Sequence, residues 1–272
     1  MKALEGAVPL AQVVLFRSVF ALPVLLLLLR GAGGWQALRT RRPLDHAWRT
    51  LFGLAGMLGA FHGITHLPLA TVTALGFTMP LFLTVLAVPL LGERVGVRRG
   101  SAVVVGFLGV LAMLLPGTVS PDAAAPDAAF WPSLAVLGGA VGWALAMITI
   151  RRMGEAGESG VSITIWFAVG CSLVAGLASL PGWLWPTPRQ WALLLAIGTI
   201  SAFAQLLMTE AYRAAEPTVV APFEYSGILW TTLLGALLWA EMPGRWDALG
   251  IAVLVASGLY IWHREATLGL RR

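Results

Sequence analysis

Nine stretches of mainly apolar residues, each of about 15 to 23 residues, dominate this chain. A helix that crosses a bilayer needs about 20 such residues, whereas a strand of a membrane barrel needs only about ten, alternating in polarity. The stretches are long and do not alternate, so they predict an all-α, polytopic membrane helix bundle. The predicted spans are Leu10–Leu29, Trp48–Leu67, Leu69–Leu91, Gly100–Leu115, Trp131–Ile150, Val161–Leu180, Gln190–Tyr212, Val219–Ala240 and Ala248–Trp262.

The composition agrees with a chain whose main partner is the lipid bilayer. Of its residues, 58% are hydrophobic and 11% are charged, against about 25% charged residues in a soluble domain. The charges lie between the apolar stretches and not in one patch, so the net charge of +5 does not indicate binding to nucleic acid. The single cysteine, Cys171, cannot form an internal disulfide.

The arginines alternate from link to link. The links after the first, third, fifth and seventh spans and the C-terminal tail carry most of the arginines. The segment from Pro116 to Ala129 carries only acidic charge, and the two remaining links have only Arg189 and Arg245. Cytoplasmic links carry the excess of basic residues, so the pattern predicts a multi-pass protein of the bacterial inner membrane with a cytoplasmic C-terminus. The residues are Arg30, Arg39, Arg41, Arg42 and Arg49, then Arg94, Arg98 and Arg99, then Arg151 and Arg152, then Arg213, then Arg264, Arg271 and Arg272.

The chain also repeats itself. Residues 70–80, followed by Glu93, correspond to residues 218–228, followed by Glu241, and the offset is 148 residues. The arginine pattern places Glu93 inside and Glu241 outside, so the two halves are expected to have opposite topology. We predict repeats over residues 1–116 and 131–264, with four and five helices. The first repeat lacks its first helix; we expect a start upstream, and the alternative is a protein that works with nine helices.

Several short motifs resemble those of the drug/metabolite transporter superfamily, in particular its EamA-type members with two five-helix inverted repeats. The resemblance implies ten helices, a central cavity between the halves and the transport of small molecules. The Pro-Phe-Glu-Tyr stretch resembles a subgroup that includes proposed carriers of S-adenosylmethionine and riboflavin. The motifs are Phe16-Arg17, Leu67-Pro68-Leu69-Ala70, Gly92-Glu93-Arg94, Pro222-Phe223-Glu224-Tyr225 and Gly258-Leu259-Tyr260.

Ionisable groups at bilayer depth are costly, so each is a candidate site residue. Glu224 begins a polar helical face in the eighth span; it would hold a proton or bind a cationic group, or else be a protonated structural carboxyl. Tyr225 would stack on a substrate ring or simply pack. Arg17, about eight residues into the first span, would bind a substrate carboxylate or phosphate, or would be paired permanently within the protein.

Uncharged polar and aromatic residues give further candidates for substrate binding. Gln205 is the central member of a polar face in the seventh span that also includes Ser201, Thr209 and Tyr212; helix–helix hydrogen bonding is the alternative role. His62, Thr78 and Trp143 are the others, each with ordinary packing as the alternative.

Two prolines and two histidines complete the candidates. Pro80 and Pro222 would serve as gating hinges, or else only as kinks. His62 and His66 lie on one helical face, but zinc needs at least a third protein ligand, so no metal site is predicted.

The sequence favours a carrier over an enzyme. It contains no His-Glu-x-x-His pair, no phosphate-cradling glycine loop and no nucleophile elbow, and no cofactor is predicted. The expected function is alternating-access transport of a small amphipathic metabolite, such as an amino acid or a cofactor-like compound. The midplane cavity would be lined by spans 2, 3, 5, 7 and 8, and Glu224 would couple a proton. A facilitative channel and a membrane scaffold are the alternatives, and a homodimer is left open.

Overall fold

Long apolar stretches form helices here because a helix satisfies every backbone polar group within one segment. In the computed structural model, all regular elements among the described residues are helical. The structure describes residues 8–67, 69–92 and 127–220, together with isolated positions at 101, 104, 105, 107, 108, 223, 224, 227, 230, 233, 234, 237, 249, 252, 253 and 256.

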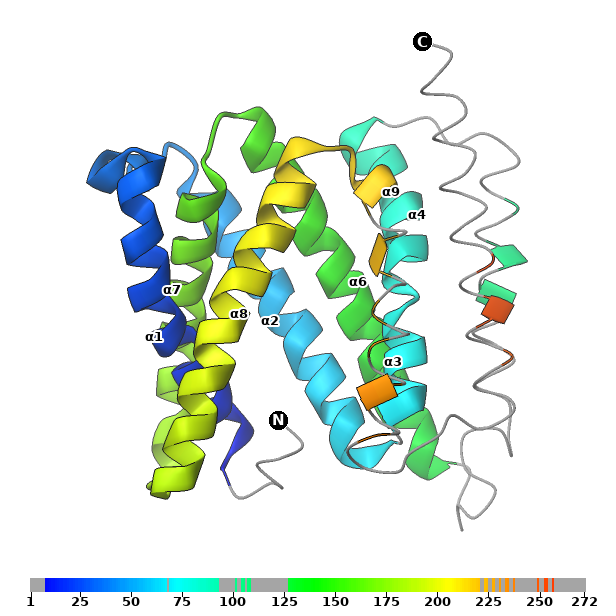
Figure 1. The fold of residues 1–272 in the computed structure, drawn as a ribbon. Helices are drawn as coiled ribbons and strands as arrows, with labels where there is room; N and C mark the ends of the chain where they lie inside the picture. The colour runs from blue at the N-terminus through cyan, green and yellow to red at the C-terminus, as the bar shows by residue number, and fades with distance from the viewer. Residues whose placement is uncertain are drawn as a thin grey trace. The chain divides into compact units, whose positions relative to one another are not determined.

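Eight α-helices and three short 3₁₀ turns are described, with labels as in Figure 1. The 3₁₀ turns are Arg30–Ala32, Gly34–Leu38 and Leu180–Gly182. The α-helices are α1 (Leu10–Leu29), α2 (Pro43–His66), α3 (Leu69–Gly76), α4 (Met79–Leu91), α6 (Asp127–Glu155), α7 (Gly160–Ser179), α8 (Pro188–Ala214) and α9 (Pro217–Val220).

Five stretches of the described chain are long and apolar enough to cross a membrane: Leu10–Ala32, Thr71–Leu91, Ala129–Glu155, Gly160–Gly182 and Pro188–Ala214. Each overlaps a predicted span, and α1 has the bounds that the sequence predicted. The predicted span Trp48–Leu67 corresponds to α2, which is not among the five. The spans Gly100–Leu115, Val219–Ala240 and Ala248–Trp262 fall largely outside the described residues, so the number of nine stays a prediction.

The third predicted span is not one continuous helix, which corrects the prediction of an unbroken run over Leu69–Leu91. A turn at Phe77 and Thr78 separates α3 from α4. Pro80 is the second residue of α4; in a continuous helix its ring would clash with the carbonyl of Gly76, four residues earlier. The Thr78 hydroxyl donates a 2.6 Å hydrogen bond to the Leu75 carbonyl and so satisfies one acceptor at the break.

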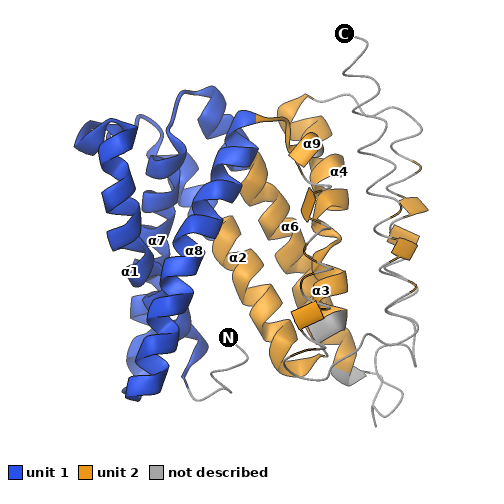
Figure 2. Ribbon diagram, in the orientation of Figure 1, with its two compact units in different colours: residues 1–51, 149–214 blue, residues 52–148, 215–272 orange. Residues whose placement is uncertain are grey.

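The chain divides into two compact units (Figure 2). Unit 1 comprises residues 1–51 and 149–214, and unit 2 comprises residues 52–148 and 215–272. The chain passes from one unit to the other within α2, within α6 and after α8. Each unit therefore contains residues of both predicted repeats.

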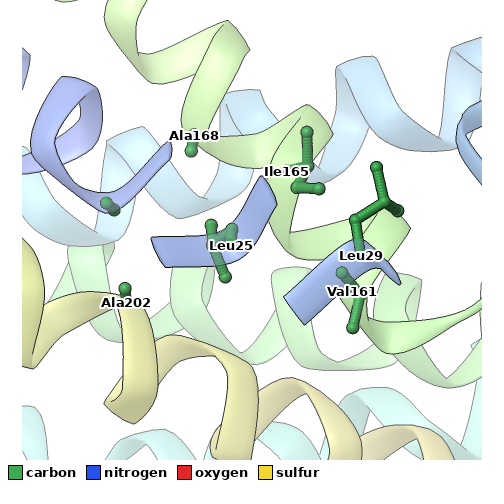
Figure 3. Packing of buried hydrophobic residues seen from close by; sticks show 7 residues of the cluster. Leu25, Leu29, Val161, Ile165, Ala168 and Ala202 are labelled. Atoms are coloured by element: carbon green, nitrogen blue, oxygen red, sulfur yellow. The ribbon is translucent and has the colours of Figure 1, made fainter. Parts of the chain in front are cut away.

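Unit 1 is built around α1, which packs against both α7 and α8 (Figure 1). Its core joins all three helices through the buried side chains of Ala21, Leu25, Leu29, Val161, Ile165, Ala168 and Ala202 (Figure 3). Several of these residues are alanines, so the helices approach closely. At Gly198 an added Cβ would lie 2.5 Å from the Cβ of Phe20, so only glycine fits there without a shift of α1.

Unit 2 contains a close contact between the later part of α2 and the earlier part of α6. A Cβ added at Gly59 would lie 2.4 Å from the carbonyl oxygen of Ala135 and 2.8 Å from the Cα of Gly139. Small residues at facing positions let two helix backbones approach in this way. Trp143 covers Gly56, where an added Cβ would lie 2.8 Å from its ring.

Candidate functional site

A small cavity lies within unit 1, between α1, α7 and α8, and both polar and apolar residues line it. Its volume of about 20 Å³ is enough for a water molecule or a group of similar size. Its apolar walls are largely small residues, which leaves the space open. The polar lining residues are Arg17, Ser18, Thr164, Ser201 and Gln205, and the apolar ones are Ala21, Leu25, Phe167, Ala168 and Ala202.

Arg17 and Ser201 form the wall of the cavity where α1 meets α8. The Nε of Arg17 donates a 3.0 Å hydrogen bond to the Oγ of Ser201. This bond fixes the plane of the guanidinium group, whose fork of donors matches a carboxylate. The sequence placed Arg17 at bilayer depth, and the structure places it at the cavity.

Gln205 also lines the cavity, from the buried face of α8. Its side chain is 8% exposed, and its Nε2 has no hydrogen-bond partner among the described residues. The Oγ1 of Thr209, one turn further along α8, is likewise unpartnered in the described part of the chain. A buried donor left without a partner costs about 1–3 kcal/mol, so this face favours a polar ligand. Arg17 and Gln205 are the two predicted site residues that the cavity brings together.

Arg49 is a buried cation next to the cavity-lining residue Phe167, and the sequence analysis did not single it out. It is 1% exposed, and its guanidinium carbon lies 4.0 Å from the centre of the Phe167 ring. None of its three guanidinium nitrogens has a hydrogen-bond partner among the described residues. A buried unpaired ion costs several kcal/mol, whereas a desolvated cation–π contact returns about 2 kcal/mol. The available signal was its position inside the predicted span Trp48–Leu67, although it was counted with the preceding link.

A polar cluster around His46 lies at the arginine-rich end of unit 1. The Nε2 of His46 lies 3.7 Å from Oε2 of Glu158, and Thr40 donates a 2.6 Å hydrogen bond to Oε1 of the same carboxylate. His46 is 6% exposed, and its ring centre lies 6.0 Å from that of Trp166. Burial lowers the pKa of His46 below its ordinary 6.5, although the negative charge of Glu158 opposes this. The lowered pKa favours the neutral imidazole at pH 7.

Other predicted site residues lie in unit 2 and do not line the cavity of unit 1. His62 is exposed on α2, with its ring centre 4.3 Å from that of His66. Trp143 is half-buried on α6 against Gly56. Thr78 and Pro80 are buried at the break between α3 and α4.

The remaining predicted site residues follow residue 220, where the structure describes only isolated positions. Glu224 is described as half-buried within unit 2 and interacts with other groups of the protein. Tyr225 and Pro222 lie outside the described residues. Within the described ranges no group of three or more His, Cys, Asp or Glu side chains could hold a metal ion.

Comparison with solved structures supports this fold. A protein crystal structure matches with a TM-score of 0.72 at 20% sequence identity, covering 100% of this chain and 92% of the other. At that identity the likeness concerns the fold alone.

Comparisons of sequence extend over most of the chain. It is 28% identical to an S-adenosylmethionine uptake transporter of Rickettsia prowazekii over 93% of this chain and 83% of that protein. It is 32% identical to a riboflavin transporter of Rhizobium johnstonii, over 92% and 78%. It is 31% identical to a pseudopaline exporter of Pseudomonas aeruginosa, over 93% and 84%.

The sequence also matches a protein-family model in two consecutive stretches, residues 1–115 and 130–262. These stretches include most of both compact units and every residue that lines the cavity. They agree with the resemblance that the short motifs indicated. The chain belongs to the EamA-like transporter family.

Proposed function

We propose that the protein is a multi-pass secondary transporter of the bacterial inner membrane that moves a small amphipathic metabolite by alternating access. The observation that carries this proposal is the group of polar residues that line the cavity of unit 1. An arginine, an amide and hydroxyl groups meet there on helices that are otherwise apolar. Polar groups at such depth are expensive and are characteristic of a substrate path.

The cavity suits one polar end of an amphipathic molecule. Arg17 and Gln205 offer charged and amide donors, while Phe167 and Leu25 offer apolar surface nearby. The related proteins are named for S-adenosylmethionine, riboflavin and pseudopaline. Both the compounds in these names and the lining of the cavity favour a small metabolite with polar and apolar parts as the substrate.

The wider mechanism is part of the same proposal. Nine spans form two inverted repeats over residues 1–116 and 131–264, and the C-terminus is cytoplasmic. The halves rock about a substrate site, with Pro80 and Pro222 as hinges. Glu224 couples a proton to the cycle. His62, Thr78, Trp143 and Tyr225 are proposed as further substrate-binding residues, and the protein performs no covalent chemistry on the substrate.

Uptake by reconstituted protein tests this function. Proteoliposomes would be offered labelled S-adenosylmethionine, riboflavin and amino acids, with and without a proton gradient. We expect saturable uptake of at least one compound, recovered chemically unchanged. Arg17→Gln and Gln205→Leu should each reduce it at least tenfold. The matched controls are Arg42→Gln and Phe203→Leu, which alter exposed side chains of unit 1.

Three results would contradict the proposal. Linear, non-saturable flux without counterflow would indicate a channel. A chemically altered product would indicate an enzyme. If the folded protein moved none of the compounds faster than empty liposomes do, a structural role in the membrane would be favoured over transport. If Glu224→Gln kept both the rate and its dependence on the proton gradient, the coupling part alone would fail.

A further inference from the structure

We infer that Arg49 is a second anion-binding group behind the cavity wall, and that the transported metabolite therefore carries a carboxylate. This inference rests on the proposed transport function and specifies its substrate class. Arg49 is buried in the first half of α2, whereas Arg17 lies on α1 at the cavity itself. The two cations belong to the same unit, so their placement does not depend on how the units are arranged.

Phe167 connects Arg49 to the cavity. Its ring lines the cavity and also lies against the Arg49 guanidinium group, 4.0 Å from the guanidinium carbon to the ring centre. The aromatic ring is thus the partition between the cavity and the second cation. A change in the Phe167 rotamer would expose Arg49 to a bound ligand without any change in the backbone.

The described carboxylates of unit 1 do not neutralise Arg49. Asp45 pairs with Arg42, Glu155 with Arg151 and Glu210 with Arg213. Glu158 accepts a hydrogen bond from Thr40 and, like the other described carboxylates, forms no ion pair with Arg49. The Phe167 ring returns less free energy than the burial of an unpaired guanidinium group costs. A negatively charged group of the substrate would offset the unfavourable free energy of the buried Arg49 guanidinium group. Binding would then depend on the charge of the substrate.

A carboxylate fits the other groups of the site. Its two oxygens accept hydrogen bonds in one plane, which matches the fork of Arg17 and the unpartnered buried amide Nε2 of Gln205. Cys171 is buried on α7. Cys171 is one helical turn after Phe167, so it is the position at which a carboxylate can be introduced beside both cations.

The test compares probes that differ in the carboxylate alone. Purified full-length protein would be titrated with leucine and leucinamide, and with S-adenosylmethionine and its methyl ester, while thermal stabilisation is measured. Uptake of S-adenosylmethionine and of riboflavin, which has no carboxylate, would be measured in parallel. We expect at least tenfold tighter binding of the carboxylate member in one pair. Arg49→Gln should reduce this preference to less than threefold, and Arg49→Lys should retain part of it.

The variant Cys171→Asp provides a second test, in which the buried cation Arg49 stays in place. The new carboxylate should raise the unfolding temperature above that of Cys171→Asn, and it should abolish the stabilisation by carboxylate probes. Cys171→Asn has nearly the same shape and no charge, and it should keep the preference. This pair separates a charge effect from a packing effect.

The outcomes are distinguishable from failure of the transport function. Equal binding of both members of each pair would overturn the inference, as would an unchanged preference in Arg49→Gln. A lower unfolding temperature in Cys171→Asp than in Cys171→Asn would also overturn it. Saturable uptake of riboflavin without any preference for carboxylates would keep the transporter and refute the second anion site. A preference for phosphate esters over carboxylates would refute the stated substrate class.

Discussion

The Nε of Arg17 lies 3.0 Å from the Oγ of Ser201, and this hydrogen bond joins α1 to α8 at the wall of the cavity. The serine accepts from the arginine, so it orients the guanidinium group without neutralising it. A hydrogen bond that involves a charged group contributes about 1.5–3 kcal/mol. The orientation of Arg17 therefore depends measurably on a hydroxyl group 184 residues away in sequence.

Ser201→Ala should weaken substrate binding more than it weakens the fold. Loss of the bond removes one constraint on the rotamer of Arg17, and about 1.4 kcal/mol corresponds to a tenfold change in affinity. We expect KM for the transported compound to rise about tenfold in the uptake assay. Ser172→Ala is the control, because the Ser172 hydroxyl only bonds the Ala168 carbonyl in its own helix. Equal KM values in the two variants would show that Ser201 does not orient Arg17.

Gly59→Ala should destabilise unit 2, because the new methyl group would overlap the α6 backbone at Ala135 and Gly139. Overpacking of this kind costs about 1–3 kcal/mol. Gly138→Ala is the matched control, since its added Cβ would meet nothing within 4 Å and alanine favours a helix over glycine by about 1 kcal/mol. Thermal unfolding in detergent should give a lower midpoint for the first variant and an unchanged or higher one for the second. The same shift in both would mean that α2 and α6 are not in this contact.

The sequence predicted a helix well where the apolar stretch and the helix begin and end at the same residues. The bounds of α1 agree with the prediction at both ends. The helix α6 begins four residues before the predicted span and ends five residues after it, at Asp127 and Glu155. Hydropathy reports the thickness of the apolar layer, and a helix continues beyond that layer when polar residues can be solvated.

The break in the third span and the site could be predicted only in part. Phe77 and Met79 are apolar, so the turn between α3 and α4 leaves no mark in hydropathy, and only Pro80 indicated it. Arg17 and Gln205 stood out as polar residues within apolar spans. Arg49 did not, because its burial depends on Phe167, which is far away in sequence and reaches it only through packing of α2 against α7. Such long-range packing has no periodic signal.

His46 should make the protein less stable as the pH falls. Its pKa in the folded protein is below the ordinary 6.5 because the imidazole is buried, so the unfolded chain binds the proton more tightly. The contribution of the neutral His46 to the free energy of unfolding is present above about pH 6.5, and it is lost as the pH falls toward the lowered pKa. Unfolding midpoints measured from pH 7.5 to pH 5 should show this decline.

Variants of His46 and Glu158 should differ in how much stability they lose as the pH falls. His46→Asn should remove that part of the pH dependence, whereas His66→Asn, which removes an exposed imidazole, should keep it. Glu158→Gln should make the decline larger, because the charge of Glu158 opposes the lowering of the His46 pKa. A decline that is the same in His46→Asn and in the unsubstituted protein would assign it to other groups.

Gln12 holds the loop before α8 against the start of α1 through both ends of its amide. Its Nε2 donates a 2.9 Å hydrogen bond to the Leu184 carbonyl, and its Oε1 accepts a 3.1 Å hydrogen bond from the Leu184 amide. The side chain is fully buried. A glutamic acid at this position reproduces both bonds only when it is protonated, because the carboxylate has no donor and faces a carbonyl oxygen.

Gln12→Glu should therefore unfold at a near-native temperature at pH 4.5 and at a clearly lower one at pH 8, with a loss of about 1–3 kcal/mol. Gln190→Glu is the matched control. Gln190 only accepts, from the Thr187 amide in a capping box at the start of α8, and a carboxylate there also favours the positive end of the helix. That variant should not lose stability as the pH rises. If both variants respond alike to pH between 4.5 and 8, the two-ended contact between Gln12 and Leu184 does not hold the loop, and the aromatic packing of Phe16 with Trp183 must do so.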